Sequence, residues 1–173
     1  MIPSDFDPLP GAKVLLVDDD PVIMTLTAAA LRGRDMIVTE ASSGEEALRL
    51  LPDDLPDVIV LDARMPGGMD GFDTCRALRA LDIPGADTLP VLMLTGTNTE
   101  EYIDRAYACG ATDFLAKADD SRQNPWSLLI GRLRNLLRAY RLQQELESSL
   151  LTLQKSRSRM TQVLTHARMG GFE

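Results

Sequence analysis

Short runs of apolar, β-branched residues alternate along the chain with amphipathic stretches at a steady interval. The run KVLLV over residues 13–17 is apolar at nearly every position, which is typical of a strand buried on both faces. Comparable runs predict further strands over residues 36–39, 57–61, 90–94 and 112–116. Five strands with helices between them predict an α/β fold: a doubly wound parallel sheet with helices on both faces.

The stretches between these strands carry helix-start signals. Asp20 is a candidate N-cap and Pro21 stands at the first helical position, so a helix is expected to about residue 32. Ser43 followed three residues later by Glu46 matches a capping box and predicts a helix to about residue 51. The remaining helices are expected over residues 71–81 and 99–108, and from Pro125 onward.

The final helix is expected to be long, because residues 125–168 contain one glycine and, after Pro125, no proline. Its first part carries a broad apolar stripe, as expected of a helix packed on a domain: Leu128, Leu129, Leu133, Leu136 and Leu137.

Farther along this helix the apolar positions narrow to a seam with heptad spacing, which predicts a parallel dimeric coiled coil. Two seams fit about equally well: Leu142, Leu146, Ser149, Leu153, Ser156, Met160 and Val163, or Leu146, Leu150, Leu153, Arg157, Met160 and Leu164. A solvated single helix or a frayed tail is the alternative.

Charge divides the chain into two parts. Residues 1–120 hold 23 acidic and 9 basic side chains, a net charge of −14, whereas residues 121–173 hold 3 and 9, a net charge of +6. An acidic body disfavours direct nucleic-acid binding, because phosphate backbones attract positive surfaces. No run of about 18 apolar residues exists, so no membrane span is expected. Cys75 and Cys109 lack metal-ligand spacing, and they are expected to be small buried side chains of a cytoplasmic protein.

Polar side chains stand where the predicted strands end. Asp18 and Asp19 follow the first strand, and Asp62 follows the third. Thr95 follows the fourth strand and Lys117 the fifth. In doubly wound sheets the functional site lies beyond the carboxyl ends of the strands, so these five groups are expected to converge.

The chemistry of this group points to phosphoryl transfer. Three clustered carboxylates repel one another unless a cation neutralises them, and Mg²⁺ suits a shallow site with oxygen ligands. A carboxylate can attack phosphorus to give an acyl phosphate, and a lysine and a hydroxyl can bind phosphoryl oxygens. Taken singly, each of these residues is more often a helix cap, a turn residue or a surface group, and their joint placement is what favours a site.

Four motifs resemble those of the bacterial response-regulator receiver domain over about residues 11–120. They are VDDDP at residues 17–21, DVIVLDARMPGGMDG at 57–71, LTG at 94–96 and GATDFLAK at 110–117. The resemblance implies a flavodoxin-like sheet with strand order 2-1-3-4-5, extended here by a long C-terminal helix. It also implies a switch module of a two-component pathway rather than a turnover enzyme.

The same resemblance implies roles for individual residues. Asp62 would be the phosphoryl acceptor, and Mg²⁺ would be bound by Asp19, Asp62 and the backbone carbonyl of Arg64, with Asp18 acting through water. Lys117 would pair with Asp62 and then with its phosphate. Thr95 would move toward the phosphate and Phe114 would rotate with it as the aromatic switch residue.

This chain departs from the family pattern in two places. Ala118 stands where the family usually has a proline after a cis peptide bond, and a cis bond before alanine costs roughly 3 kcal/mol, so a trans bond is favoured here. The loop after Asp62 carries an additional glycine, Gly67 or Gly68, which loosens it. Neither change removes a reactive group.

The expected organisation has four parts: an N-terminal extension at residues 1–10, a receiver domain at 11–124, a helix continuing into a coiled-coil linker at 125–168, and the start of a downstream domain at 169–173. The final residues 166–173 (HARMGGFE) resemble the start of a PAS-type domain. Expected partners are a histidine kinase or phosphotransfer protein, a second copy of this chain and an output domain in cis.

Three alternatives remain. A stand-alone receiver is disfavoured by the long amphipathic extension. A metal-dependent phosphatase is disfavoured because Arg64 occupies the position, two residues after Asp62, where such enzymes carry a general-acid aspartate. A degenerate receiver serving as a dimerisation scaffold is disfavoured by the intact acids, threonine and lysine.

Overall fold

The computed structural model describes residues 7–96, 99–117 and 125–169, with side chains in the last range described for residues 126–159. Ala118 and the end of the PAS-like segment, residues 170–173, lie outside the described residues. The chain divides into two compact units, Met1–Arg138 and Ala139–Glu173. No helix in the described part of the chain is both long enough and apolar enough to cross a bilayer.

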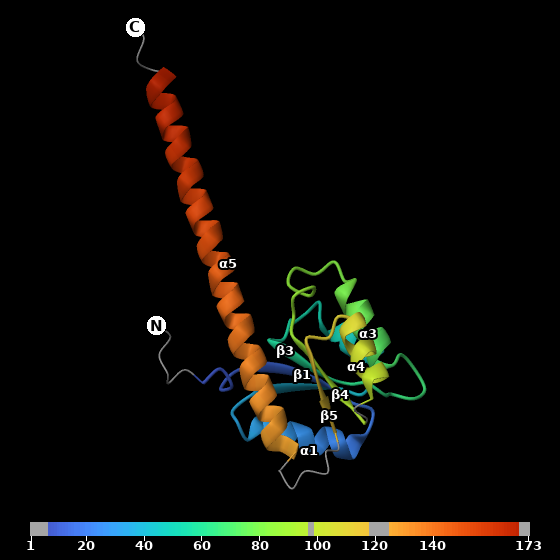
Figure 1. Cartoon of the computed structure of the whole chain (residues 1–173). Coiled ribbons are helices and arrows are strands. Elements are labelled where there is room, and N and C mark those ends of the chain that lie inside the picture. Colours follow the sequence, from blue (N-terminus) through green and yellow to red (C-terminus); the bar gives the residue numbers. More distant parts are fainter. Residues whose placement is uncertain (1–6, 97–98, 118–124, 170–173) are drawn as a thin grey trace. The chain divides into compact units, whose positions relative to one another are not determined.

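The first unit is built on five parallel strands in the order β2-β1-β3-β4-β5 (Figure 1). This order and the alternation of strands and helices confirm the predicted doubly wound α/β fold. The elements are β1 (Lys13–Val17), α1 (Pro21–Arg32), β2 (Ile37–Ala41), α2 (Gly44–Leu50), β3 (Val58–Asp62), α3 (Gly71–Arg79), β4 (Val91–Thr95), α4 (Glu100–Ala108), β5 (Asp113–Ala116) and α5 (Pro125–Met169).

The strands lie within two residues of their predicted bounds. β1 is as predicted, whereas β3 and β4 start one residue later and end on Asp62 and Thr95. These polar residues belong to the ladder because Asp62 is in register with Leu94, and Thr95 is in register with Ala116. The pairing between strands therefore places the Asp62 carboxylate and the Thr95 hydroxyl at the carboxyl-terminal edge of the sheet.

Two apolar cores cover the two faces of the sheet. Alternate residues of each strand point to opposite faces, so in β1 Leu15 and Val17 enter one core and Val14 and Leu16 the other. The first core packs against α2, α3 and α4, and the second against α1 and the start of α5 (Figure 1). Leu9 also joins the second core with 1% of its surface exposed, although it precedes the predicted start of the domain.

The caps of the first two helices follow the sequence signals in part. The Asp20 carboxylate accepts hydrogen bonds from the backbone N–H groups of Val22 and Ile23, as the predicted N-cap should. Ser43 Oγ accepts from the Glu46 backbone N–H at 3.1 Å. The Glu46 carboxylate, however, accepts from the Ser42 N–H and hydroxyl at 2.7 Å rather than closing back on Ser43. The second half of the predicted capping box is therefore displaced by one residue.

The two cysteines are buried as expected, and the fold also brings them together. Cys75 lies in α3 and Cys109 ends α4, and both are part of the first core. The interaction between the two thiols raises the pKa of Cys75 and lowers the pKa of Cys109 to about 7. This contact could not be predicted from the sequence, because the two cysteines are far apart along the chain and meet only where α3 packs beside α4.

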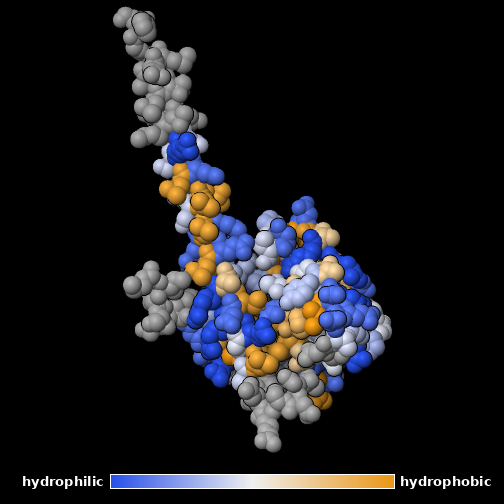
Figure 2. All heavy atoms as spheres, viewed as in Figure 1, coloured by the Kyte–Doolittle hydropathy of each residue, from blue (hydrophilic) through white to orange (hydrophobic). Residues whose placement is uncertain are grey.

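The second unit is a single helical segment. From residue 142 to residue 159 every side chain is exposed. Leu146 and Leu153 are exposed over 61% and 65% of their surface, and orange, hydrophobic surface runs along this segment in Figure 2. The helix has exposed leucines on both predicted seams, and the described part of the chain leaves this apolar surface uncovered.

Candidate functional site

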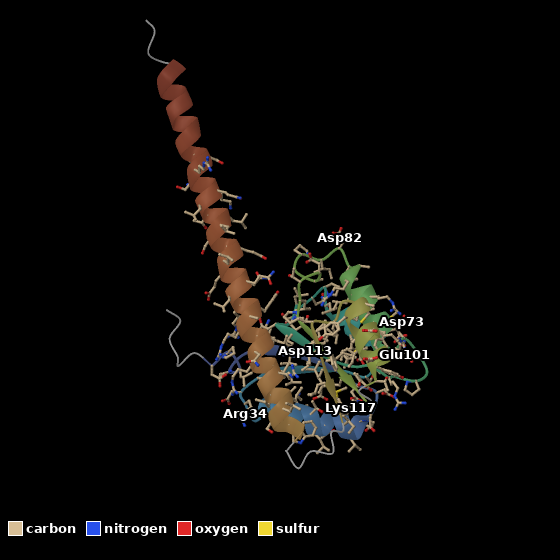
Figure 3. All side chains as sticks on the ribbon, in the orientation of Figure 1. Arg34, Asp73, Asp82, Glu101, Asp113 and Lys117 are labelled. Atoms are coloured by element: carbon tan, nitrogen blue, oxygen red, sulfur yellow. The ribbon has the colours of Figure 1, made fainter. Side chains whose placement is uncertain are left out.

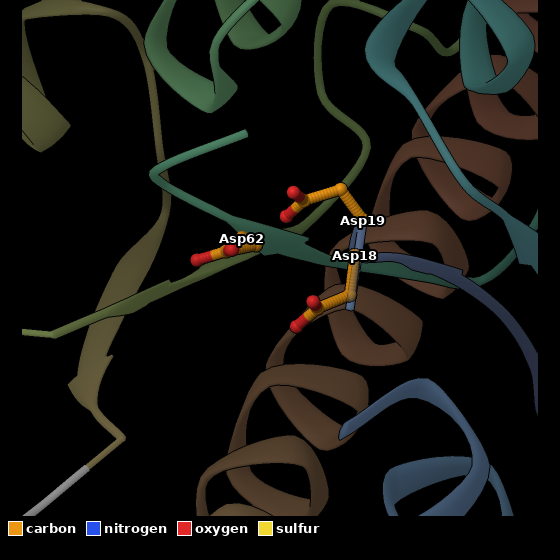
Figure 4. A group of neighbouring side chains, drawn as sticks. All are labelled: Asp18, Asp19 and Asp62. Atoms are coloured by element: carbon orange, nitrogen blue, oxygen red, sulfur yellow. The ribbon is translucent and has the colours of Figure 1, made fainter. Parts of the chain in front are cut away.

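The polar residues predicted at the strand ends meet at one edge of the sheet. Asp18 and Asp19 directly follow β1, and Asp62 ends β3. Carboxylate oxygens from these three residues all lie within 4.8 Å of one another (Figure 4). Lys117 directly follows β5 and reaches this cluster from the far edge of the sheet (Figure 3).

The three carboxylates differ in burial. Asp18 is 1% exposed and Asp62 is 6% exposed, whereas Asp19 faces solvent. Asp18 Oδ1 also accepts a hydrogen bond from the Asp20 backbone N–H at 3.0 Å, which fixes its orientation. The cluster is therefore open on the Asp19 side and rigid on the other.

Lys117 bridges the two buried carboxylates. Its Nζ lies 2.7 Å from Asp18 Oδ2 and 3.0 Å from Asp62 Oδ2. The contact with Asp62 was expected from the sequence, but the shorter one with Asp18 was not. It arises because β1 and β3 are neighbours in the sheet, so both carboxylates stand within reach of one ammonium group. One cation thus compensates two buried anions.

Burial and charge oppose each other at this site. Burial raises the pKa of Asp62, as does the charge of Asp18, and the Lys117 ammonium and the Arg64 backbone N–H only partly offset this. Burial lowers the pKa of Lys117, but its hydrogen bonds and charge interactions with Asp18 and Asp62 outweigh it, and the net shift is upward. Lys117 therefore stays protonated. An additional cation beside Asp62 would stabilise the ionised form of its carboxyl group.

Close backbone packing shapes the loop that follows Asp62. A Cβ on Gly71 would lie 2.0 Å from the Asp62 carbonyl oxygen, so only glycine lets α3 start this close to β3. Gly67 adopts φ 95°, a left-handed conformation that favours glycine. The Glu45 carboxylate on α2 accepts a hydrogen bond from the Met69 backbone N–H at 3.0 Å. This tether to a loop widened by a glycine had no sequence signal.

The two predicted switch residues lie on adjacent strands. Thr95 is 1% exposed, and its carbonyl accepts a 2.6 Å hydrogen bond from the Lys117 backbone N–H. Phe114 is half-buried in β5 and packs edge-to-face on Tyr107 of α4, with ring centroids 5.8 Å apart. Tyr107 is exposed over 53% of its surface and was not identified from the sequence. Backbone contact thus links Thr95 to Lys117, and an aromatic contact links β5 to α4.

The chemistry of the donors decides which cation this cluster fits. All three side chains offer hard carboxylate oxygens, no sulfur or imidazole takes part in the cluster, and one of the three is open to solvent. Mg²⁺ prefers such oxygen ligands and retains several waters, so the cluster fits it. The half-buried Lys117 ammonium beside Asp62 is a second positive group directed at the same carboxylate.

The chain is similar to a known protein family and to solved structures. The family model described as the response regulator receiver domain matches residues 14–123 of this chain. The chain is 35% identical to the chemotaxis protein CheY4 of Vibrio cholerae, and that match covers 72% of this chain and 98% of CheY4 with a TM-score of 0.63.

Two longer proteins are similar over most of this chain. The transcriptional regulatory protein AfsQ1 of Streptomyces coelicolor is 34% identical over 149 residues, which cover 86% of this chain and 61% of AfsQ1. The response regulator PleD of Caulobacter vibrioides is 37% identical over 128 residues, which cover 74% of this chain and 26% of PleD. This chain therefore spans less than two thirds of the length of either relative.

Proposed function

The chain belongs to the response regulator receiver domain family, and we propose on this basis that Asp62 accepts the phosphoryl group that switches it. The observation that carries the proposal is the contact of a half-buried lysine with a buried aspartate at a strand end. Lys117 Nζ lies 3.0 Å from Asp62 Oδ2, inside a cluster of three carboxylates. This arrangement supplies a nucleophile, a phosphoryl-binding cation and a metal site at one point.

The proposed reaction is a direct transfer from a phosphohistidine of a kinase or phosphotransfer protein. An oxygen of the Asp62 carboxylate attacks phosphorus, the P–N bond breaks with its electron pair returning to the imidazole, and a P–O bond forms. Lys117 moves its hydrogen bond from the carboxylate to a phosphoryl oxygen, and the Thr95 hydroxyl binds another. Bound Mg²⁺ supplies charge neutralisation between the carboxylates and the transferring group.

We assign the metal ligands to Asp19, Asp62 and the backbone carbonyl of Arg64, with Asp18 contacting the ion through water. The exposure of Asp19 supports a direct role, because it leaves room for an ion and its waters. The 2.7 Å contact of Asp18 with Lys117 supports an indirect role, because one of its oxygens is already engaged. The site accepts a phosphoryl group, and the resulting acyl phosphate is then hydrolysed slowly. The protein does not turn over any other substrate.

Switching is assigned to Thr95 and Phe114. The new phosphate draws the Thr95 hydroxyl toward it, and Phe114 rotates inward as β4 and β5 adjust. The packing of Phe114 on Tyr107 supports this, because such a rotation must release an edge-to-face contact on α4. The surface of α4 and β5 therefore changes with phosphorylation.

We further propose the division into an extension at residues 1–10, a receiver at 11–124, a helical linker at 125–168 and the start of a PAS-like output domain at 169–173. The linker is assigned to a parallel coiled-coil dimer that passes the signal on. Exposed leucines on both seams support the dimer, and the length of AfsQ1 and PleD beyond the matched region supports an output domain. The proposed location is the cytoplasm.

The test is intact-mass analysis after incubation with acetyl phosphate, with and without Mg²⁺. Wild type should gain one phosphoryl group only when Mg²⁺ is present, and Asp62→Asn should gain none. Asp82→Asn is the matched control, since Asp82 is an exposed aspartate outside the cluster (Figure 3). An equal adduct on wild type and Asp62→Asn, or none on wild type with Mg²⁺ present, overturns the assignment.

A further inference from the structure

The loop between Asp62 and α3 closes on itself. The Gly71 backbone N–H donates a hydrogen bond to the Ala63 carbonyl at 3.2 Å, and the Arg64 backbone N–H donates one to Asp62 Oδ1 at 3.3 Å. These bonds join both ends of the loop to the end of β3. Arg64, whose carbonyl is a proposed Mg²⁺ ligand, therefore lies within a closed backbone ring formed by residues 63–71.

Part of this ring is held weakly by its own residues. Met65 is 5% exposed and packs in the first core, whereas Pro66, Gly67 and Gly68 are exposed. Two consecutive glycines give the backbone great conformational freedom, and Gly67 uses this freedom at φ 95°. Ordering such a segment costs conformational entropy. A contact from outside the ring therefore has a large influence on which shape the ring keeps.

Glu45 makes that contact. Its Oε1 accepts a hydrogen bond from the Met69 backbone N–H at 3.0 Å, and no other hydrogen bond among the described residues joins residues 66–69 to a different helix or strand. Glu45 lies in the first turn of α2, where its own backbone N–H and that of Met69 lower the pKa of its carboxyl group. The acceptor is therefore ionised at neutral pH, and charge-assisted hydrogen bonds are stronger than neutral ones.

Gly68 leaves the space that the Glu45 carboxylate occupies. A Cβ at position 68 would lie 3.1 Å from Glu45 Oε1 and 3.4 Å from Glu45 Oε2, so the flexible glutamate side chain would have to move away from Met69. The backbone of Gly68, unlike that of Gly67, is not in the left-handed region, so its conformation alone does not require glycine. Glycine at position 68 is thus explained by the room that Glu45 needs.

We propose that Glu45 is a positioning residue for the metal site: its hydrogen bond to Met69 fixes the ring that contains the Arg64 carbonyl, and thereby strengthens Mg²⁺ binding. Glu45 stands outside the carboxylate cluster and does not itself contact the ion or the phosphoryl group. This inference rests on the metal site of the proposed function. It adds that α2, which carries none of the site residues, controls how tightly the ion is bound.

Two substitutions of Glu45 separate the hydrogen bond from the charge. Glu45→Ala removes both, whereas Glu45→Gln removes the charge and keeps an oxygen that accepts from Met69. In calorimetric titrations with Mg²⁺ and no phosphoryl donor, Glu45→Ala should weaken binding by about three- to tenfold and Glu45→Gln by less than about twofold. Arg49→Ala, at an exposed position of α2, is the control and should bind as wild type does. Equal weakening in Glu45→Gln and Glu45→Ala, or none in Glu45→Ala, overturns the positioning role.

Gly68→Ala tests the same contact from the loop side. The added methyl group should displace the Glu45 carboxylate and weaken Mg²⁺ binding by about three- to tenfold. The double variant should bind no more weakly than either single variant, because both changes break one contact. Without Mg²⁺, the Met69 amide should exchange its hydrogen about three- to tenfold faster in both single variants than in wild type, as measured by NMR. Effects that multiply in the double variant, or unchanged Met69 exchange, overturn the pairing of Glu45 with Gly68.

The rate of phosphoryl acceptance separates this inference from the proposed function. With acetyl phosphate and limiting Mg²⁺, Glu45→Ala should react about three- to tenfold more slowly than wild type, and at saturating Mg²⁺ it should reach the wild-type rate. A rate that stays low at saturating Mg²⁺ overturns a role through the metal. Wild type that binds Mg²⁺ but accepts no phosphoryl group contradicts the proposed function alone, and wild type that binds no Mg²⁺ overturns both.

Discussion

Several leucines of α5 are buried in the first unit of this protein, whereas the described leucines of the second are exposed. Leu133 and Leu137, in the first unit, are 0% exposed and form part of the core on one face of the sheet. Leu146 and Leu153, in the second, are exposed over 61% and 65% of their surface. The first pair is covered by the rest of the domain, whereas no described residue of the chain covers the second.

The difference separates a folded domain from a helix whose leucines no described part of the chain covers. In the first unit Asp18, Asp62 and Lys117 come from three strands, and the sheet fixes all three before any ligand arrives. In the second unit local helix-forming tendency is the main stabilisation, and an isolated helix is marginal without tertiary packing. Substitutions of the same kind should therefore have unlike effects in the two units.

The largest expected contrast is between two leucine truncations. Leu133→Ala should lower the free energy of unfolding by about 3–4 kcal/mol, because it leaves a cavity in the core. Leu153→Ala, the matched change in the second unit, should lower it by less than about 0.5 kcal/mol. Urea unfolding followed by Trp126 fluorescence measures both. Similar losses for the two variants would mean that the second helix packs into the same cooperative unit.

The next contrast concerns lysines. Lys117→Met leaves two buried carboxylates facing each other, and should destabilise the protein by about 2–3 kcal/mol without divalent cations. This is less than for a fully buried pair, because 26% of the Lys117 side chain is exposed. Lys155→Met, on the exposed helix, should change stability by less than about 0.5 kcal/mol. Equal urea midpoints for wild type and Lys117→Met would refute the electrostatic account of the site.

Divalent cation should stabilise the first unit selectively. At thirty times its Kd, Mg²⁺ should raise the free energy of unfolding by about 2 kcal/mol, since it binds the native cluster and not the unfolded chain. Asp19→Asn should lose most of this gain, whereas Asp82→Asn should keep it. The measurement is a series of urea titrations at rising Mg²⁺. An undiminished gain in Asp19→Asn would remove Asp19 from the ligand set.

The smallest effect distinguishes the two seams of the exposed helix. Leu142 belongs to the first seam only and Leu150 to the second only, whereas Leu146 and Leu153 belong to both. If the first seam forms the dimer, Leu142→Ser should weaken association by about tenfold and Leu150→Ser much less. The second seam predicts the reverse, and sedimentation velocity over a range of concentrations decides. Wild type that stays monomeric at all concentrations would exclude the coiled coil.

The sequence predicted the fold well because its signals are local. Apolar runs located every strand within two residues, and Asp20 and Pro21 marked the start of α1. Groups at the strand ends could be placed at one edge because parallel strands share a direction. These signals need no knowledge of which side chains finally touch.

Contacts between distant residues were harder to predict. The 2.7 Å pairing of Lys117 with Asp18, the interaction of the Cys75 and Cys109 thiols, and the packing of Phe114 on Tyr107 all depend on neighbouring elements of the finished fold. Thr27 Oγ1 has no hydrogen-bond partner among the described residues, and this too could not be predicted, because a threonine inside a helix ordinarily bonds to its own backbone. Local pattern thus identified the groups at the site, and tertiary packing decided their partners.

The most direct test of the central claim locates the phosphoryl group on the chain. After incubation with acetyl phosphate and Mg²⁺, borohydride reduces an aspartyl phosphate to homoserine, which peptide mass spectrometry assigns to a position. The account predicts homoserine at position 62 and none at 18, 19 or 20. Homoserine at another aspartate, with position 62 unmodified, would contradict the assignment of Asp62 as the phosphoryl acceptor.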